Sequence, residues 1–312
     1  RADAVPERRP WQFVTEDMKS KLCVEGELMQ TLGWYNGNYG TLDEMTVPMN
    51  DRVHWFGDGA YDATSCHNYR IFAIDEHIDR FFNSASLLGI PIPMQKPELK
   101  DLLNDLVKKL DSGDIFVYFQ VTRGGLSLRN HDYDPDVPGH VWVMLKPAKL
   151  NEGTEPIKLI TGEDLRFFYC NIKTLNLLPS VMAAQRAKRA GADEHIFWRR
   201  TPLGKRVTEC AHSNCHIIRD NVLYTAPADE MILPGIARAH LIRMCKKLGY
   251  PVSETPYYLD DLLSAQEVLV TSSSNPCLRA ESVDGKPMGG RAREMVEDLR
   301  KHLVEEFYEA TE

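Results

Sequence analysis

No apolar run in this chain of 312 residues approaches the roughly 20 residues that a membrane-spanning helix needs, so we expect no membrane association. Positive charge is outnumbered by negative charge. There are 37 Lys and Arg residues against 45 Asp and Glu residues, which gives a net charge of −8. An acidic surface argues against nucleic acid as a partner, because the phosphate backbone repels it. Residues 1–11 are polar and interrupted by proline, so we expect no signal peptide there.

The cysteines lack the spacing of a metal site or of a disulfide framework. There are seven, an odd number, and no two of them form a Cys-x-x-Cys pair. Cys210 and Cys215 are the one close pair, and their spacing does not suit zinc. We therefore expect reduced thiols, a cytoplasmic location and no bound metal.

Several nucleotide-binding and hydrolase motifs are missing as well. The sequence contains no G-x-x-x-x-G-K-[ST], no G-x-G-x-x-G after a strand, no H-E-x-x-H, no G-x-S-x-G and no calcium-binding loop. Walker-type or Rossmann-type nucleotide binding and standard serine hydrolysis therefore have no support.

What is present is the composition of an ordinary globular protein, with 43% hydrophobic and 26% charged residues. The length predicts about two domains. We place an N-terminal α+β domain at residues 1–149, a linker at 150–156, where the sequence is polar and aperiodic, and a C-terminal domain at 157–312. Strand and helix patterns alternate irregularly, which favours an α/β or α+β fold over a regular doubly wound sheet.

Local patterns predict particular elements. Residues 59–74 resemble two strands that turn near Asn68, and Asp75 is a candidate N-cap for the helix that follows. Residues 207–225 resemble one strand, a turn at Asp220-Asn221 and a second strand. Further patterns predict strands at 115–122 and 140–146 and a helix at 236–248.

Two residues are candidates for covalent and electrostatic catalysis. Lys173 lies among apolar neighbours just before a predicted helix, and a desolvated lysine amine can attack an aldehyde. Glu209 follows a strand pattern and could pair with a cationic ring nitrogen if it is buried. Taken singly, each also fits an ordinary surface residue.

A second set of residues could bind a phosphate group. Leu233-Pro234-Gly235 leads into a predicted helix that starts with Ile236 and Ala237, and the first N–H groups of a helix bind anions. Ser272 and Ser273 add hydroxyls at a strand end, and Arg80 could add a charged contact. Each motif alone is also a common turn, cap or surface arginine.

A third set could bind a carboxylate. Arg129 and His131 lie two residues apart on a long irregular loop, and Tyr61 follows a glycine-rich turn. A guanidinium and an imidazolium with a phenol nearby can hold a carboxylate. The alternative is a solvated loop.

The order and spacing of these motifs resemble the fold-type IV pyridoxal-phosphate enzymes, also called class IV aminotransferases, and among them the D-amino-acid aminotransferases. The resemblance extends from about residue 45 to 305 and rests on the following motifs: Gly57-Asp58-Gly59-Ala60-Tyr61, Glu76-His77-Ile78-Asp79-Arg80, Tyr118-Phe119-Gln120-Val121-Thr122-Arg123-Gly124, Arg129-Asn130-His131, Ile172-Lys173-Thr174-Leu175-Asn176-Leu177-Leu178, Val207-Thr208-Glu209, Ser213-Asn214, Leu233-Pro234-Gly235-Ile236 and Asp284-Gly285-Lys286.

The resemblance implies a two-domain fold-type IV architecture, with a small α+β domain, a larger pseudo-barrel domain and the cofactor between them. It implies a homodimer that carries out transamination between a D-amino acid and a 2-oxo acid, with ping-pong kinetics through pyridoxamine phosphate. Lys173 would bind pyridoxal 5'-phosphate as a Schiff base, and Glu209 would keep the ring nitrogen protonated. The other implied contacts are Arg80, Ile236, Ala237, Ser272 and Ser273 for the phosphate, Leu233 for the ring face, and Tyr61, Arg129 and His131 for the substrate carboxylate.

The sequence also departs from the family pattern. Cys210-Ala211-His212 stands where relatives mostly have smaller residues, Ala237 replaces a frequent Thr, and residues 1–30 form an extension without a counterpart. Branched-chain L-aminotransferase, (R)-amine transaminase and aminodeoxychorismate lyase share the fold and stay open as alternatives. A non-catalytic relic that acts as an interaction partner is the alternative from another class.

Overall fold

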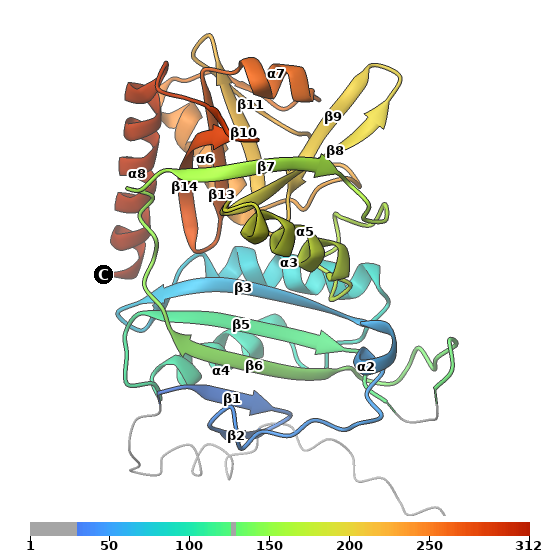
Figure 1. The fold of residues 1–312 in the computed structure, drawn as a ribbon. Helices are drawn as coiled ribbons and strands as arrows, with labels where there is room; N and C mark the ends of the chain where they lie inside the picture. The colour runs from blue at the N-terminus through green and yellow to red at the C-terminus, as the bar shows by residue number, and fades with distance from the viewer. Residues whose placement is uncertain (1–29, 126–128) are drawn as a thin grey trace, which may run out of the picture.

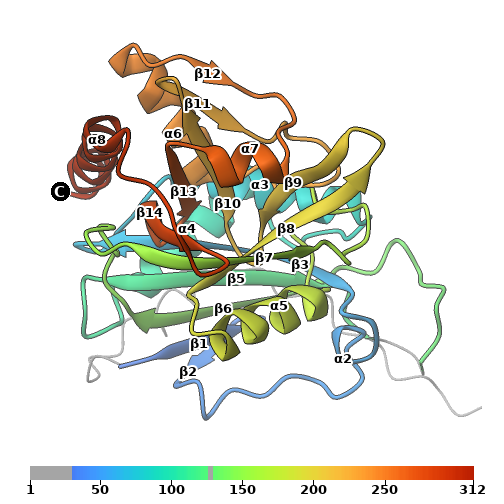
Figure 2. The ribbon, with the colours of Figure 1, turned by 45° about the horizontal axis from the view of Figure 1, so that its top comes forward.

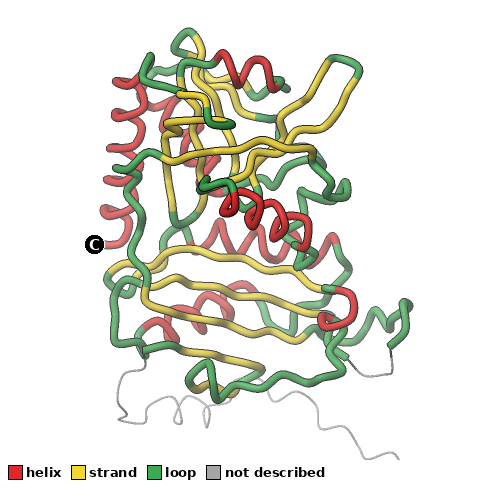
Figure 3. The backbone as a smooth tube through the Cα atoms, in the orientation of Figure 1, coloured by secondary structure: helices red, strands yellow, loops and turns green. Residues whose placement is uncertain are grey.

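The structure, a computed structural model, describes residues 30–125 and 129–312. The extension expected at residues 1–30 therefore lies outside the described residues, except for residue 30. The strands form two separate groups, with helices between and beside them (Figure 3). No helix among the described residues is long and apolar enough to cross a membrane.

The first group is an antiparallel sheet of six strands in the order β2-β1-β6-β5-β3-β4 (Figure 1). Its strands are β1 (Leu32–Tyr35), β2 (Asn38–Gly40), β3 (Gly59–His67), β4 (Arg70–Ile71), β5 (Ile115–Thr122) and β6 (His140–Pro147), and its helices are α2 (Val53–Phe56), α3 (Ile74–Leu87) and α4 (Lys96–Val107). Apolar side chains of α3 and α4 pack with those of β5 and β6 into one core, which includes Phe81, Leu103 and Phe119.

The second group is a sheet of nine strands, ordered β12-β11-β10-β13-β14-β7-β8-β9, with β15 paired to β14. Its strands are β7 (Ile157–Glu163), β8 (Glu194–Thr201), β9 (Gly204–Cys210), β10 (Asn214–Arg219), β11 (Val222–Thr225), β12 (Val252–Ser253), β13 (Glu267–Ser272), β14 (Asn275–Val283) and β15 (Lys286–Pro287), and its helices are α5 (Leu178–Arg189), α6 (Ile236–Leu248), α7 (Leu259–Ser264) and α8 (Arg293–Thr311). β7 runs parallel to both β14 and β8.

The helices of the second group occupy different places around its sheet. α6 and α8 share an apolar core with β13 and β14. α5 lies apart from them (Figure 2), and its Ala183 packs against Phe197 of β8. This mixed arrangement of strands and helices confirms the predicted fold class. Residues 148–156 connect the two sheets. The domain boundary at 150–156 stays a prediction.

Two local predictions need correction. Helix α3 begins at Ile74, and its N-cap is Ala73 in a left-handed conformation, not Asp75. The backbone is left-handed at Asn68 and Tyr69, in the β3–β4 turn, and again at Ala73. The chain therefore turns from β4 into the helix before it reaches Asp75. Residues 207–225 form parts of three strands, because β9 ends at Cys210 and residues 211–213 turn into β10.

Candidate active site

A cavity of about 260 Å³ lies where elements of the two sheets meet. β3 and α3 supply part of its wall, and the rest comes from the segment before α5, from β9 and β10, from the start of α6 and from the end of β13. It is lined by every residue predicted for the site except Arg129 and His131: Tyr61, Arg80, Lys173, Glu209, Leu233, Ile236, Ala237, Ser272 and Ser273. Residues more than 200 positions apart in the sequence thus share one wall.

Lys173 is held in place through its backbone. The Tyr61 N–H of β3 donates to the Lys173 carbonyl over 2.9 Å, and the Lys173 N–H donates to Ser84 Oγ over 3.2 Å. The amine lies 4.4 Å from the centre of the Tyr61 ring, where the aromatic face attracts a cation. Pro179 near the start of α5 ends the irregular segment that carries the lysine. The backbone of Lys173 is therefore held by β3 and α3 of the first group, and its amine lies at the cavity wall beside Tyr61.

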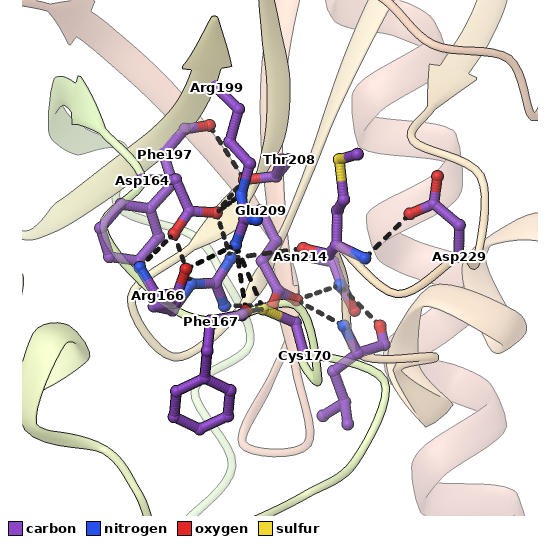
Figure 4. Close-up of polar contacts among 12 residues, drawn as sticks. Asp164, Arg166, Phe167, Cys170, Phe197, Arg199, Thr208, Glu209, Asn214 and Asp229 are labelled. Atoms are coloured by element: carbon purple, nitrogen blue, oxygen red, sulfur yellow. Dashed lines mark hydrogen bonds and ion pairs between the residues drawn. The ribbon is translucent and has the colours of Figure 1, made fainter.

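Glu209 is a buried carboxylate with both oxygens in use (Figure 4). Arg166 Nη1 donates to Oε1 over 2.5 Å, and Oε2 accepts from Asn214 Nδ2 and from the Leu233 N–H, each over 3.0 Å. Burial raises the pKa of Glu209 above its ordinary value, and the Arg166 guanidinium acts against burial. The carboxylate is thus oriented by three donors.

Arg166 is positioned in turn by Asp164, which follows β7 (Figure 4). Asp164 accepts from Arg166, from Arg199 Nε over 3.0 Å and from Thr208 Oγ1 over 3.1 Å. Burial acts to raise the pKa of Asp164, but the two guanidinium groups outweigh it and lower the pKa. No motif in the sequence predicted this cluster. An Asp and an Arg two residues apart are too common to signal it.

An anion cradle lies at another part of the cavity wall. Helix α6 starts after Gly235 and has no side-chain cap, so its first N–H groups keep donors for a ligand. A Cβ atom at position 235 would lie 2.0 Å from Asn214 Oδ1, so any other residue there would displace the amide that donates to Glu209. Ser272 and Ser273, at the end of β13, line the same cavity.

Arg80 reaches the cavity from α3 as part of a buried ion pair. Its Nε and Nη2 donate to Asp62 over 2.8 and 2.7 Å, and His77 Nδ1 lies 2.7 Å from the same carboxylate. Burial acts to raise the pKa of Asp62, but Arg80 and His77 hold it well below its usual range. Arg80 Nη1 also donates to the Pro234 carbonyl over 3.3 Å, next to the anion cradle.

The structure does not bring Arg129 and His131 to this cavity. The Arg129 guanidinium lies 5.0 Å from the centre of the Phe56 ring, and the His131 ring lies 5.0 Å from the same ring. Arg52 Nη2 donates to the His131 carbonyl over 3.1 Å. Both residues therefore lie beside α2, and Tyr61 is the one predicted carboxylate contact that lines the cavity.

Comparison with known sequences gives one consistent result. The model of the family described as amino-transferase class IV matches residues 59–283. A D-alanine aminotransferase of Listeria monocytogenes is 38% identical over 280 residues, which is 88% of this chain and 96% of that protein. A D-alanine aminotransferase of Staphylococcus aureus is 33% identical over 278 residues, covering 86% of this chain and 96% of that protein.

A solved structure shows the same architecture in two ligand states. The branched-chain amino acid aminotransferase of T.th., complexed with N-(5'-phosphopyridoxyl)-L-glutamate, matches with a TM-score of 0.80 and 25% identity, over 91% of this chain and 95% of that one. The same enzyme with pyridoxamine 5'-phosphate also matches with a TM-score of 0.80 and 25% identity, over 89% and 94% of the two chains.

Proposed function

The chain belongs to the class IV aminotransferase family, and we propose that it transfers the amino group of a D-amino acid, of the D-alanine or D-glutamate type, to a 2-oxo acid such as pyruvate or 2-oxoglutarate. Its cofactor in this proposal is pyridoxal 5'-phosphate, and its kinetics are ping-pong. One observation carries the proposal: a lysine amine, a buried carboxylate and an anion cradle line a single cavity.

The residues present fit that cofactor. The uncapped start of α6 and the hydroxyls of Ser272 and Ser273 suit a phosphate dianion, and Arg80 adds positive charge beside them. A protonated ring nitrogen suits the buried carboxylate of Glu209. The missing hydroxyl at Ala237 leaves the backbone N–H as the donor there. When bound, the cofactor accepts the electron pair that stays on the substrate Cα after its proton leaves.

Lys173 has two tasks in this proposal. Its amine would hold the cofactor covalently, and as a free amine it would remove the proton from the substrate Cα. The hydrogen bonds on both sides of Lys173 keep the amine within reach of that carbon. The Tyr61 ring beneath the amine stabilises its protonated form once the proton has been taken.

Glu209 holds a proton at the ring nitrogen. It does so best as the anion, and the guanidinium of Arg166 favours the anion against the effect of burial. Asn214 and the Leu233 N–H fix the direction of the carboxylate. The Leu233 side chain, which lines the cavity, supports the ring face.

In this proposal, Arg129 and His131 of a second copy of the chain bind the substrate carboxylate. Tyr61 of the chain that forms the cavity contacts the same carboxylate. Their place beside α2, away from the cavity of their own chain, supports an intermolecular role. Apolar side chains are also exposed on both sides of Lys173 in the sequence, and a homodimer would cover them: Leu165, Phe168, Tyr169, Leu178, Val181 and Met182.

The compartment is part of the proposal too. The six cysteines in the described ranges, Cys66, Cys170, Cys210, Cys215, Cys245 and Cys277, are all free thiols. Reduced thiols in this number support a cytoplasmic protein.

A transamination panel tests the function and its rivals. The purified protein is incubated with both enantiomers of alanine, glutamate and leucine and of 1-phenylethylamine, with pyruvate as acceptor. We expect turnover of D-alanine and D-glutamate, together with a visible absorbance that responds to them. Preference for L-leucine would favour a branched-chain L-aminotransferase, and preference for (R)-1-phenylethylamine would favour an amine transaminase. The absence of a bound chromophore would favour the non-catalytic relic.

A further inference from the structure

A third pair of a carboxylate and a cation lies at the cavity, besides Glu209–Arg166 and Asp62–Arg80. His212 lies in the turn between β9 and β10 and lines the cavity together with Lys173. Its Nδ1 lies 2.8 Å from Oε2 of Glu194, the first residue of β8. The His212 side chain is 63% exposed, whereas that of Glu194 is 4% exposed. The ring of His212 is therefore exposed, whereas the carboxylate of Glu194 is buried.

Glu194 is built into the protein as a fixed anion. Its Oε1 accepts from the His195 N–H over 2.8 Å, and its Oε2 accepts from Ser213 Oγ over 2.7 Å as well as facing His212. Burial acts to raise the pKa of Glu194, but the contacts with His212, His195 and Ser213 outweigh it and lower the pKa. Burying a carboxylate costs free energy, and the contacts with His212, His195 and Ser213 offset that cost for Glu194. The fold therefore holds His212 next to Glu194.

Glu194 in turn favours the protonated form of the His212 ring. The hydrogen bond with Glu194 raises the pKa of His212 above its ordinary value, and partial burial and the charge of Lys173 act against it. These two titratable groups act on the ring, Glu194 from β8 and Lys173 from the segment before α5. Because Nδ1 bonds to Glu194, the Nε2–H of the imidazolium is the donor that a ligand in the cavity can use.

The other cations of the cavity have assigned partners or tasks. Arg80 pairs with Asp62, Arg166 pairs with Glu209 and Asp164, and Lys173 supplies the reacting amine. His212 is also paired, with Glu194 through Nδ1, but its exposed ring adds a positive charge that the chemistry at Cα does not need. A substrate with one carboxylate, such as D-alanine, leaves that charge unused, whereas a second carboxylate on the substrate would match it.

We propose that His212, positioned by Glu194, binds the distal carboxylate of an acidic substrate and so directs the enzyme towards D-glutamate and 2-oxoglutarate. The inference rests on the proposed transamination and deepens it by assigning the residue that recognises an acidic side chain of the substrate. His212 contacts the substrate, and Glu194 acts through His212 as a positioning residue.

The first test compares two substrates in His212→Gln, which keeps a hydrogen-bond donor but loses the charge. The conversion of the cofactor by D-glutamate and by D-alanine is followed by absorbance in single half-reactions. Loss of a charged hydrogen bond predicts that kcat/KM for D-glutamate falls about ten- to a hundred-fold, while that for D-alanine stays near the wild-type value. His302→Gln is the matched control, because His302 pairs with Asp298 on α8 and does not line the cavity.

A second variant tests the positioning role through pH. Because the imidazolium exists below its pKa, the wild-type ratio of glutamate to alanine reactivity should fall as pH rises through the pKa of His212. Glu194→Gln removes the carboxylate that raises this pKa, so the fall should move to lower pH. A merely structural role of Glu194 would lower both reactivities and leave the midpoint of the ratio where it was, and that result would overturn the positioning role.

Calorimetry with dead-end carboxylates separates failure of this inference from failure of the proposed function, because it needs no turnover. Glutarate should bind the wild-type holoenzyme more tightly than butyrate, and His212→Gln should remove the difference. An equal loss of affinity for both ligands, or of reactivity with both substrates, would show that His212 contacts the α-carboxylate or stabilises the fold. Either result would overturn the proposal. A wild-type enzyme that binds glutarate in this way yet converts no D-amino acid would contradict the transamination alone.

Discussion

Nη1 of Arg166 lies 2.5 Å from Oε1 of Glu209, in a buried ion pair between the segment after β7 and the strand β9. The pair joins the carboxylate at the cavity wall to Asp164, Arg199 and Thr208 behind it (Figure 4). Glu209 therefore acts as part of a charged cluster, and its proton affinity depends on residues that do not touch the cavity.

The ion pair predicts a shift in the pH dependence of Arg166→Met. Burial already raises the pKa of Glu209, and without the guanidinium the pKa should rise further. Because the anion is the working form, activity is lost as pH falls through this pKa, and the loss should begin at higher pH in the variant. The measurement is the single-turnover rate with D-alanine across the acid range.

Glu209→Gln is the companion variant for this prediction. It should retain the cofactor, lack the acid limb and slow Cα deprotonation by about ten- to a hundred-fold or more, the value of a lost charged contact. An acid limb that stays at the wild-type pH in Arg166→Met would show that Glu209 does not control the reaction.

Lys173 is expected to be indispensable for covalent cofactor binding. Only a primary amine at this wall of the cavity can form the bond, so Lys173→Ala should lose both the pyridoxal phosphate that borohydride fixes and nearly all turnover. The measurement is mass spectrometry of the reduced protein. Lys188→Ala, near the end of α5, serves as the control and should remain fully labelled. Covalent label on Lys173→Ala would place the chemistry on another lysine.

The Asp62–Arg80 pair predicts a stability that depends on pH. Asp62→Asn leaves a buried guanidinium without its anion and should lower the free energy of unfolding by about 3–5 kcal/mol at neutral pH. The pKa of Asp62 is lowered by folding, so its contribution is present above its unfolded pKa of about 4 and is lost as pH falls further.

Urea unfolding at pH 7 and at successively lower pH measures this contribution. The gap between wild type and Asp62→Asn should narrow as the pH falls. Asp79→Asn is the control: Asp79 pairs with Lys96 at 65% exposure, so its loss should cost less than about 1 kcal/mol. Equal effects of the two variants would contradict the buried pair as a source of stability.

Arg129→Ala tests the proposed carboxylate contact. Loss of a charged hydrogen bond should cut kcat/KM for D-alanine about ten- to a hundred-fold. The amine (R)-1-phenylethylamine carries no carboxylate, so its turnover, where it occurs, should be spared. An equal loss on both substrates would make Arg129 structural, and a wild-type preference for L-alanine would overturn the assignment of handedness.

The exposed apolar side chains of α5 predict a dimer that a single charge weakens. Met182 is 54% exposed, and Met182→Glu would place a carboxylate in the proposed interface. Light scattering should show a dimer for the wild type and a lower mass for the variant, with activity lost in proportion. Leu203→Glu, in the turn between β8 and β9, is the control and should remain dimeric. A fully active wild-type monomer would refute the intermolecular site.

Much of the local structure could be predicted from the sequence. Strands β5 and β6 and helix α6 were predicted to within about a residue, because apolar periodicity and flanking glycines report directly on such elements. The Asp284-Gly285 turn indicates a hairpin, and β14 and β15 form it. The extent of β14 could not be predicted, since Asn275–Val283 contains a proline and two charged residues and lacks the usual alternation. The strand forms because β13 and β7 pair with it on its two sides.

The sequence by itself determined which motifs are present: a lysine before a helix, a carboxylate at a strand end and a glycine turn before a helix. Such motifs are local, so their residue types and spacing are visible without a fold. The tertiary structure decided which residues meet. Arg166 reaches Glu209 across 43 positions and His212 reaches Glu194 across 18, because the registers of β7, β8 and β9 place them together. It also placed Arg129 and His131 beside Phe56 and away from Lys173, because the chain that carries them folds against α2, a packing contact that no spacing in the sequence encodes.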